Sequence, residues 1–147
     1  MTFRFSLQKL LNLKEKEAEH YKLLIKNKRL ALLELKKVLE TERINYFKDR
    51  DELNTLLKNC NLVKVPSYES SLELRKKRMI EILENIKTLE MDISFLQQSL
   101  IQTKRKVKLY EKLKEKKLNE YLQEENLKEK NAFDEFSQIK HFFKCHS

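Results

Sequence analysis

Residues 59–67, with the sequence NCNLVKVPS, contain the single proline, Pro66, of a 147-residue chain that has no glycine. Glycine permits tight turns with positive φ and proline interrupts helices, so a domain with many connections normally uses several of each. The composition is 37% charged and 40% apolar and is rich in Leu, Lys and Glu, which is typical of a coiled coil. The sequence therefore predicts an all-α fold: a long antiparallel two-helix coiled coil, or helical hairpin, whose second helix is longer than the first.

The predicted boundaries treat residues 1–147 as a single coiled-coil hairpin, with the first helix at 5–61, the turn at 62–67 and the second helix at 68–143. Ser67 is the expected N-cap of the second helix, because a serine hydroxyl can accept a hydrogen bond from the first turn. The segment Asn59-Cys60-Asn61 is expected to fray. If the turn centres near residue 65, the equal rise of both helices places residue i opposite residue 130 − i, at about 1.5 Å per residue.

Two heptad columns predict the seam along which the helices pack. Every seventh residue from Leu11 to Cys60 is uncharged, whereas the companion column from Leu7 to Val63 mixes apolar and charged residues. Charged residues at such positions weaken a seam but help to set its register. In the second helix the seam is expected at Leu72, Met79, Ile86, Ile93, Leu100 and Val107, with Ile82, Leu89, Leu96 and Tyr110, and then in a shifted phase at Leu113, Leu118, Leu122 and Leu127.

An apolar stripe follows in the second helix, beyond the point where the first helix is used up. With the register above, Leu11 lies near Asn119, and residues from about 128 onward have no opposing helix. The stripe consists of Phe133, Phe136, Ile139, Phe142 and Phe143, spaced for one helical face. Two interpretations are open: the stripe folds back on Phe3 and Phe5, or it is a docking surface for another protein.

The net charge of +9 raises the question of nucleic-acid binding. However, 23 acidic residues are interspersed with the basic ones, and no base-stacking spacing or nucleic-acid motif is present, so an acidic protein partner explains the charge more simply and no nucleic-acid partner is expected. The longest apolar run, Leu30 to Leu33, is far shorter than the roughly 20 residues that span a bilayer. No secretory signal is recognisable at residues 1–7, so a cytoplasmic location is expected.

No catalytic chemistry is expected from this chain. A bare hairpin offers no water-excluded cavity, and a chain without glycine has no phosphate-binding glycine loop, so neither an enzyme nor a cofactor is predicted. His141, Cys145 and His146 match no zinc pattern, and no metal site is predicted. Cys60 and Cys145 fall at opposite ends of the predicted hairpin, which excludes a disulfide within the chain.

Both ends of the sequence resemble the FliJ family, the small coiled-coil protein of the flagellar type III export apparatus. The first match is Phe3-Arg4-Phe5-Ser6-Leu7-Gln8-Lys9-Leu10-Leu11, followed by Lys14-Glu15-Lys16-Glu17. The second match is Phe133-Asp134-Glu135-Phe136-Ser137-Gln138, similar to an acidic and aromatic signature near the end of that family. Chain length and the single central interruption also fit.

The resemblance implies a non-enzymatic stalk that enters the central hole of a hexameric export ATPase, promotes its assembly, and links it to the cytoplasmic domain of the membrane export gate and to export chaperones. It implies a cytoplasmic protein that is peripheral at the cytoplasmic face of the inner membrane, at the flagellar basal body. Residues implied to face the ATPase are Phe3, Phe5, Phe133, Asp134, Glu135 and Phe136. Those implied to face the gate are Phe47, Tyr68 and Leu72, whereas Tyr46, on the heptad column, is expected to serve packing.

Three alternatives remain open at the level of sequence. One is a structural scaffold that self-associates through a continuous helix, which a break at Pro66 would contradict. Another is a stalk homologue from a non-flagellar type III secretion system. The third is a nucleic-acid-binding hairpin, for which salt-sensitive RNA binding would be the sign.

Overall fold

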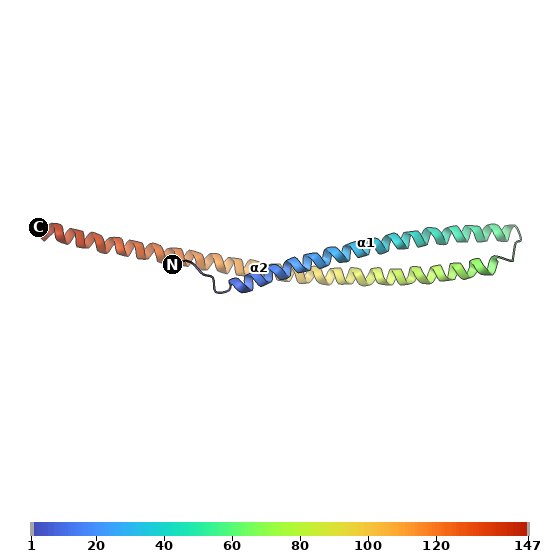
Figure 1. The fold of residues 1–147 in the computed structure, drawn as a ribbon, viewed down its shortest axis with the longest axis horizontal. Coiled ribbons are helices and arrows are strands. Elements are labelled where there is room, and N and C mark those ends of the chain that lie inside the picture. Colours follow the sequence, from blue (N-terminus) through green and yellow to red (C-terminus); the bar gives the residue numbers. More distant parts are fainter. Residues whose placement is uncertain (1, 147) are drawn as a thin grey trace. The chain divides into compact units, whose positions relative to one another are not determined.

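The computed structural model describes residues 2–146, except for the side chain of His146. Two α-helices account for nearly all of this part of the chain: α1 (Gln8–Lys58, 51 residues) and α2 (Val65–His146, 82 residues). The helices pack against each other, and the described residues contain no strand (Figure 1). The predicted helical hairpin, with the second helix longer than the first, is confirmed.

The chain divides into two compact units, each of which contains part of both helices. The paired unit is Glu19–Ile101, and it includes the reversal of the chain between α1 and α2. The terminal unit combines Met1–Ala18 with Gln102–Ser147. Each unit is described separately below.

The core of the paired unit lies on the predicted heptad columns. Ile25 of α1 and both Ile86 and Ile93 of α2 are buried, with at most 8% of each residue exposed. The other apolar members of these columns within α1 and α2 are half-buried, because a seam between two helices covers only one side of each helix, whereas Cys60 and Val63, in the reversal of the chain, are exposed. Apolar residues recurring every seven positions thus give the two helices their common face.

The end of α1 is capped rather than frayed. Cys60 adopts positive φ (56°), and its N–H donates to the carbonyl of Leu57 at 3.3 Å. The N–H of Asn61 donates to the carbonyl of Leu56 at 3.0 Å. These two bonds form a Schellman motif, which satisfies carbonyls that a helix end otherwise leaves open. The expectation of fraying at Asn59-Cys60-Asn61 is therefore wrong, and Cys60 occupies the position that usually belongs to glycine.

The start of α2 also differs from the prediction. The N–H of Tyr68 donates to the carbonyl of Lys64 at 3.2 Å, so Lys64 is the N-cap, and the helix begins at Val65 rather than at residue 68. Ser67 lies inside the first turn and is not the N-cap. Pro66 is tolerated there because its backbone nitrogen needs no helical acceptor in the first turn.

The register of the paired unit is shifted from the predicted one. Lys28 contacts Asp92, whereas pairing around residue 65 would place it opposite Gln102. Tyr68 contacts Glu52, whereas the predicted register places Arg78 opposite Glu52. Both contacts centre the hairpin on Cys60 instead of residue 65. The shift arises because α1 ends at Lys58 and α2 starts before Pro66, so the reversal occupies residues 59–64.

In the terminal unit, the seam continues without the expected change of phase. Leu11, Ala18 and Thr103 are buried, and Phe3 packs against Tyr121 with ring centroids 5.6 Å apart. Lys114, which shares a heptad column with Val107 and Tyr121, is half-buried. Of the four predicted shifted positions, Leu113 is half-buried, but Leu118, Leu122 and Leu127 are exposed, so the prediction is wrong for those three. The aliphatic stem of a lysine can cover a seam while its ammonium group stays in water.

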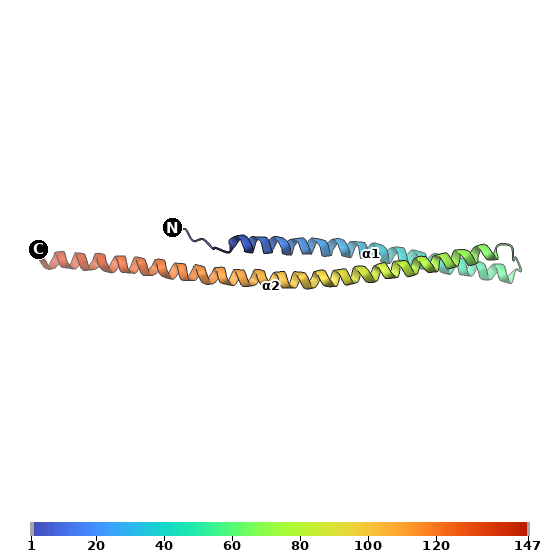
Figure 2. The same cartoon turned by 90° about the horizontal axis from the view of Figure 1, so that it is seen from below.

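Beyond this seam, α2 has no helix beside it. Every residue from 126 to 145 is exposed, and Figure 2 shows this part of α2 as a single helix. Phe3 lies against Tyr121, and the stripe at residues 133–143 does not fold back onto it. The fold-back interpretation of the stripe is therefore wrong. Among the described residues, neither helix combines the length and apolarity needed to cross a bilayer.

Candidate docking surfaces

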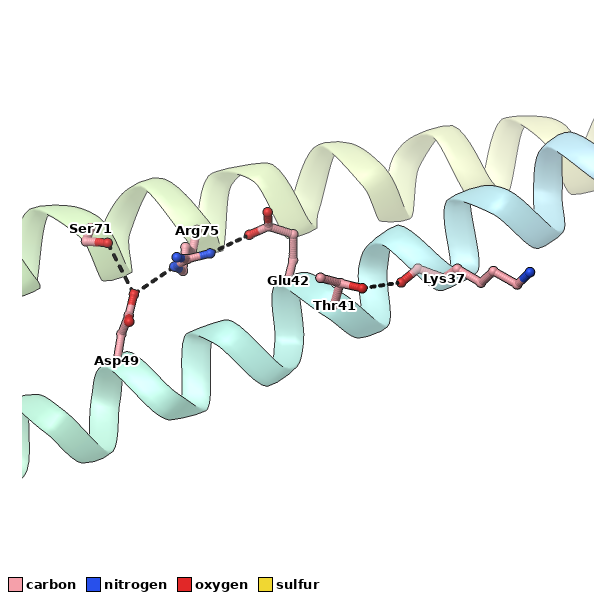
Figure 3. A network of polar contacts seen from close by, with 6 residues as sticks. All are labelled: Lys37, Thr41, Glu42, Asp49, Ser71 and Arg75. Carbon is pink, nitrogen blue, oxygen red and sulfur yellow. Dashed lines mark hydrogen bonds and ion pairs between the residues drawn. The ribbon is translucent and has the colours of Figure 1, made fainter.

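A polar cluster links the two helices inside the paired unit (Figure 3). Arg75 of α2 donates from Nε to Asp49 Oδ2 at 2.8 Å and from Nη1 to Glu42 Oε2 at 3.2 Å. Ser71 Oγ donates to the same Asp49 oxygen at 3.3 Å. Asp49 and Glu42 are one heptad apart on the companion column of α1, so a single guanidinium group bridges two consecutive seam positions. These side chains are only about a fifth exposed, which reduces screening by water.

Hydrogen bonds to carboxylates shift two pKa values in this region. The bond from Arg75 to Asp49 raises the pKa of the guanidinium group, and Glu42 acts in the same direction, while desolvation opposes both. Tyr68 Oη donates to Glu52 Oε2 at 2.9 Å. That bond, and then the negative charge of Glu52, raises the pKa of the Tyr68 phenol, because ionisation would remove the donor and place two anions together.

The residues predicted to face the export gate differ in how much of each side chain is free to contact a partner. Phe47 is exposed and packs edge-on against Tyr46 at 5.5 Å, with the guanidinium group of Arg43 over its ring. Tyr68 is half-buried and hydrogen-bonded to Glu52, and Leu72 is half-buried on the seam. Tyr46 is half-buried beneath the ammonium group of Lys76. Phe47 therefore offers the largest available surface, whereas the other two predicted residues have contacts within the hairpin.

The residues predicted to face the ATPase fall into two groups within the terminal unit. Phe3 and Phe5 are half-buried and line a shallow groove of about 300 Å³ with Tyr121. Phe133 and Phe136 are exposed, at 69% and 64%, and the carboxylates of Asp134 and Glu135 lie next to them in the sequence. Phe133 lies twelve positions after Tyr121 on α2, a rise of about 18 Å along the helix. The structure therefore does not bring the two groups together.

A groove of about 730 Å³ runs between α1 and α2 in the paired unit. Its apolar lining consists of Ile25, Leu30, Leu33, Leu100 and Ile101. Three cations, Lys22, Lys26 and Arg29, come from α1, and Gln97 comes from α2. The groove is open along its length, so it suits a surface contact rather than an enclosed reaction.

No metal-binding group was found among the described residues. Cys145 Sγ lies 3.6 Å from His141 Nε2, one helical turn away, and the side chain of His146 lies outside the described residues. In the part of the chain described, no three His, Cys, Asp or Glu side chains lie together so that they could hold an ion. Cys60 and Cys145 are both free and exposed.

Sequence analysis missed two polar members of the second-helix seam, Arg75 and Thr103. Both lie on the same heptad column as Ile82, Leu89 and Leu96, and following that column through polar residues would have found them. The groove was missed for another reason: it depends on which residue of α2 faces Arg29, and this requires the correct register.

These surfaces define a class of protein. The described residues form a helical hairpin that presents exposed apolar and charged side chains on helix faces and in open grooves, as expected for a coiled-coil protein that works by contact with partners.

The family model described as Flagellar FliJ protein matches residues 3–144. The chain therefore belongs to the FliJ family, as its two ends suggested, and it is a component of the flagellar export apparatus. The family is an export component rather than an enzyme family. Comparison with curated proteins and with solved structures gave no match.

Proposed function

We propose that this protein is the non-enzymatic central stalk of the hexameric flagellar export ATPase, promoting its assembly and activity and linking it to the export gate and to export chaperones. Membership of the FliJ family supports a role in this apparatus. The observation that carries the finer proposal is the exposed stripe in residues 126–145, where α2 continues with no helix beside it.

The stripe has the chemistry of a docking surface. Phe133, Phe136 and Phe143 are each at least 64% exposed, and burial of a phenylalanine side chain against a partner contributes about 1.5–3 kcal/mol. Asp134 and Glu135, between the two phenylalanines in the sequence, add exposed carboxylates, which would orient the contact with basic side chains of the ATPase. We assign Phe133, Asp134, Glu135 and Phe136 to the main contact, and Phe3 and Phe5 to a secondary one, because they are half-buried.

The proposed contact with the cytoplasmic domain of the export gate centres on Phe47. Its ring is exposed, while Tyr68 and Leu72 support the same region through contacts inside the hairpin. The protein would then act at the cytoplasmic face of the inner membrane, as a peripheral component of the basal body. A scaffold built on one continuous helix is not supported, since the chain reverses between Lys58 and Val65.

Double substitution of the stripe tests the proposal. Phe133→Ala with Phe136→Ala in the full chain should weaken binding to the purified export ATPase by more than about tenfold, since aromatic anchors carry much of the energy of such contacts. Stimulation of ATP hydrolysis should fall with binding. The matched control is Phe95→Ala with Met91→Ala, because Phe95 and Met91 are exposed to the same extents, 69% and 64%, and lie in the paired unit.

Circular dichroism should show unchanged helicity in both double variants, because alanine is the best helix former and these side chains are exposed. Full ATPase binding and stimulation by the stripe variant would overturn the assignment. Loss of self-association instead, measured by sedimentation, would favour a scaffold role for the stripe.

A further inference from the structure

The groove between α1 and α2 in the paired unit has an apolar lining that the hairpin itself leaves uncovered. Ile25 is buried at its floor, whereas Leu30, Leu33 and Ile101 are each at least half exposed. Contact between apolar surface and water is unfavourable. A docked apolar side chain would remove this surface from solvent and would stabilise the complex by about 25 cal/mol for each Å² buried.

The charge of this groove is not balanced within the described residues. Lys22 pairs with Glu19 at 2.9 Å, but Lys26 and Arg29 form no ion pair in the part of the chain described. Elsewhere in the paired unit, cations that reach across the hairpin meet carboxylates: Lys28 contacts Asp92 at 3.6 Å, and Lys36 contacts Glu90 at 4.0 Å. The polar residue that α2 contributes to the groove is the neutral Gln97, beside the apolar Leu100 and Ile101.

We infer that this groove binds an acidic amphipathic helix of a partner protein. The apolar face of that helix would pack on Leu30, Leu33 and Ile101, as a third helix packs along two others. Its carboxylates would pair with Lys26 and Arg29, the two cations of the groove that form no ion pair among the described residues. An open groove between two helices suits a helix better than a lipid surface, for which a convex amphipathic face is needed.

The inference does not rest on the proposed stalk function. The groove belongs to the paired unit, whereas the proposed ATPase contact belongs to the terminal unit. Substitutions in the groove and in the stripe therefore test separate claims.

A designed peptide can serve as the probe, since the natural partner segment is not identified by the groove. The probe is a fluorescein-labelled amphipathic helix of about 20 residues, with leucines on one face and glutamates on the other. Its binding to the full chain is measured by fluorescence anisotropy. Binding should weaken as salt is raised, because exposed ion pairs are screened.

Charge reversal at Lys26→Glu with Arg29→Glu should weaken peptide binding by about tenfold or more. The matched control is Lys48→Glu with Arg50→Glu, which makes the same change of net charge at exposed positions of α1 outside the groove. The control should bind the peptide within about threefold of the unchanged protein, since distant charges act only through a screened field. A third variant, Leu30→Ala with Leu33→Ala, should also weaken binding while keeping every charge.

Circular dichroism confirms that each variant is helical before its binding is interpreted. Equal weakening by both charge reversals would show non-specific attraction and would overturn the inference, as would failure of the unchanged protein to bind the peptide. Binding to anionic vesicles that depends on Lys26 and Arg29, without peptide binding, would assign the groove to lipid instead. Loss of a dimer on substitution of Leu30 and Leu33, measured by sedimentation, would assign it to a second copy of this chain.

Discussion

The paired unit and the segment 126–145 are built from the same kind of helix but differ in what surrounds it. In the paired unit, apolar side chains at heptad spacing, such as Ile86 and Ile93, are buried against α1. In residues 126–145 of α2, aromatic side chains such as Phe133 and Phe136 are mostly exposed, because no helix lies beside them.

The comparison shows that apolar side chains at helical spacing do not by themselves make a core. The partner helix decides whether they stabilise the hairpin or remain available to another molecule. Side chains of the paired unit should therefore control stability, and those of the segment 126–145 should control binding.

The largest expected effect on the free energy of unfolding comes from replacing one side chain in each region. Ile93→Ala should lower the free energy of unfolding by about 2–4 kcal/mol, because Ile93 is only 8% exposed and its loss leaves a cavity in the seam. Phe136→Ala, at a position that is 64% exposed, should change it by less than about 0.5 kcal/mol. Urea unfolding followed by circular dichroism measures both. Equal losses would show that the stripe packs within the protein and would remove the contrast.

A smaller effect is expected from the polar cluster of the paired unit. Arg75→Ala should cost about 1–2 kcal/mol, because it leaves Asp49 and Glu42 partly buried without their cation. Arg78→Ala, at a nearby exposed position, should cost less than about 0.5 kcal/mol. Thermal unfolding at low and high salt provides the measurement, and the cost at Arg75 should decrease as salt rises. If both arginines behave alike, the cluster adds nothing beyond a surface charge.

The smallest effect concerns Tyr68 at alkaline pH. Its pKa in the folded protein is raised above the ordinary value of 10.0, first by the hydrogen bond to Glu52. The folded state therefore holds the phenolic proton more tightly than the unfolded state, so this contribution to stability is complete below about pH 10 and is lost as the pH rises through the folded pKa.

Glu52→Gln should return the titration of Tyr68 toward its ordinary pKa, as followed by NMR of labelled tyrosine rings. Glu73→Gln, which removes an exposed carboxylate of α2, serves as the control. A Tyr68 titration unchanged by Glu52→Gln would mean that the hydrogen bond does not persist in solution.

The hairpin and the exposed stripe could be predicted from sequence because they depend on simple features. Heptad spacing identifies the packed face whatever the turn looks like, and a single break at Pro66 allows one reversal of the chain. Unequal arms then leave part of the second helix uncovered. None of these inferences requires the position of an individual side chain across the hairpin.

The register and the groove could not be predicted, because both depend on how the turn is built. Cys60 takes a conformation usually left to glycine, and no sequence signal marks a cysteine for it. Pro66 suggested a turn at the proline itself, whereas it lies inside the first turn of α2. Since the register was displaced, the pairing of Arg75 with Asp49 and the neutral position of Gln97 opposite the cations of α1 could not be inferred.

The charged residues of the seam have a further consequence for how the protein folds. A repeated heptad pattern allows one helix to slide along the other by one repeat, about 10 Å, while apolar residues still meet apolar residues. Such a slide would place Leu35 or Leu56 against Arg75, in place of one of its two carboxylates, and would move Asp92 away from Lys28. The ion pairs thus penalise misaligned hairpins, and a chain with few turn signals uses them to select one alignment among several of similar hydrophobic energy.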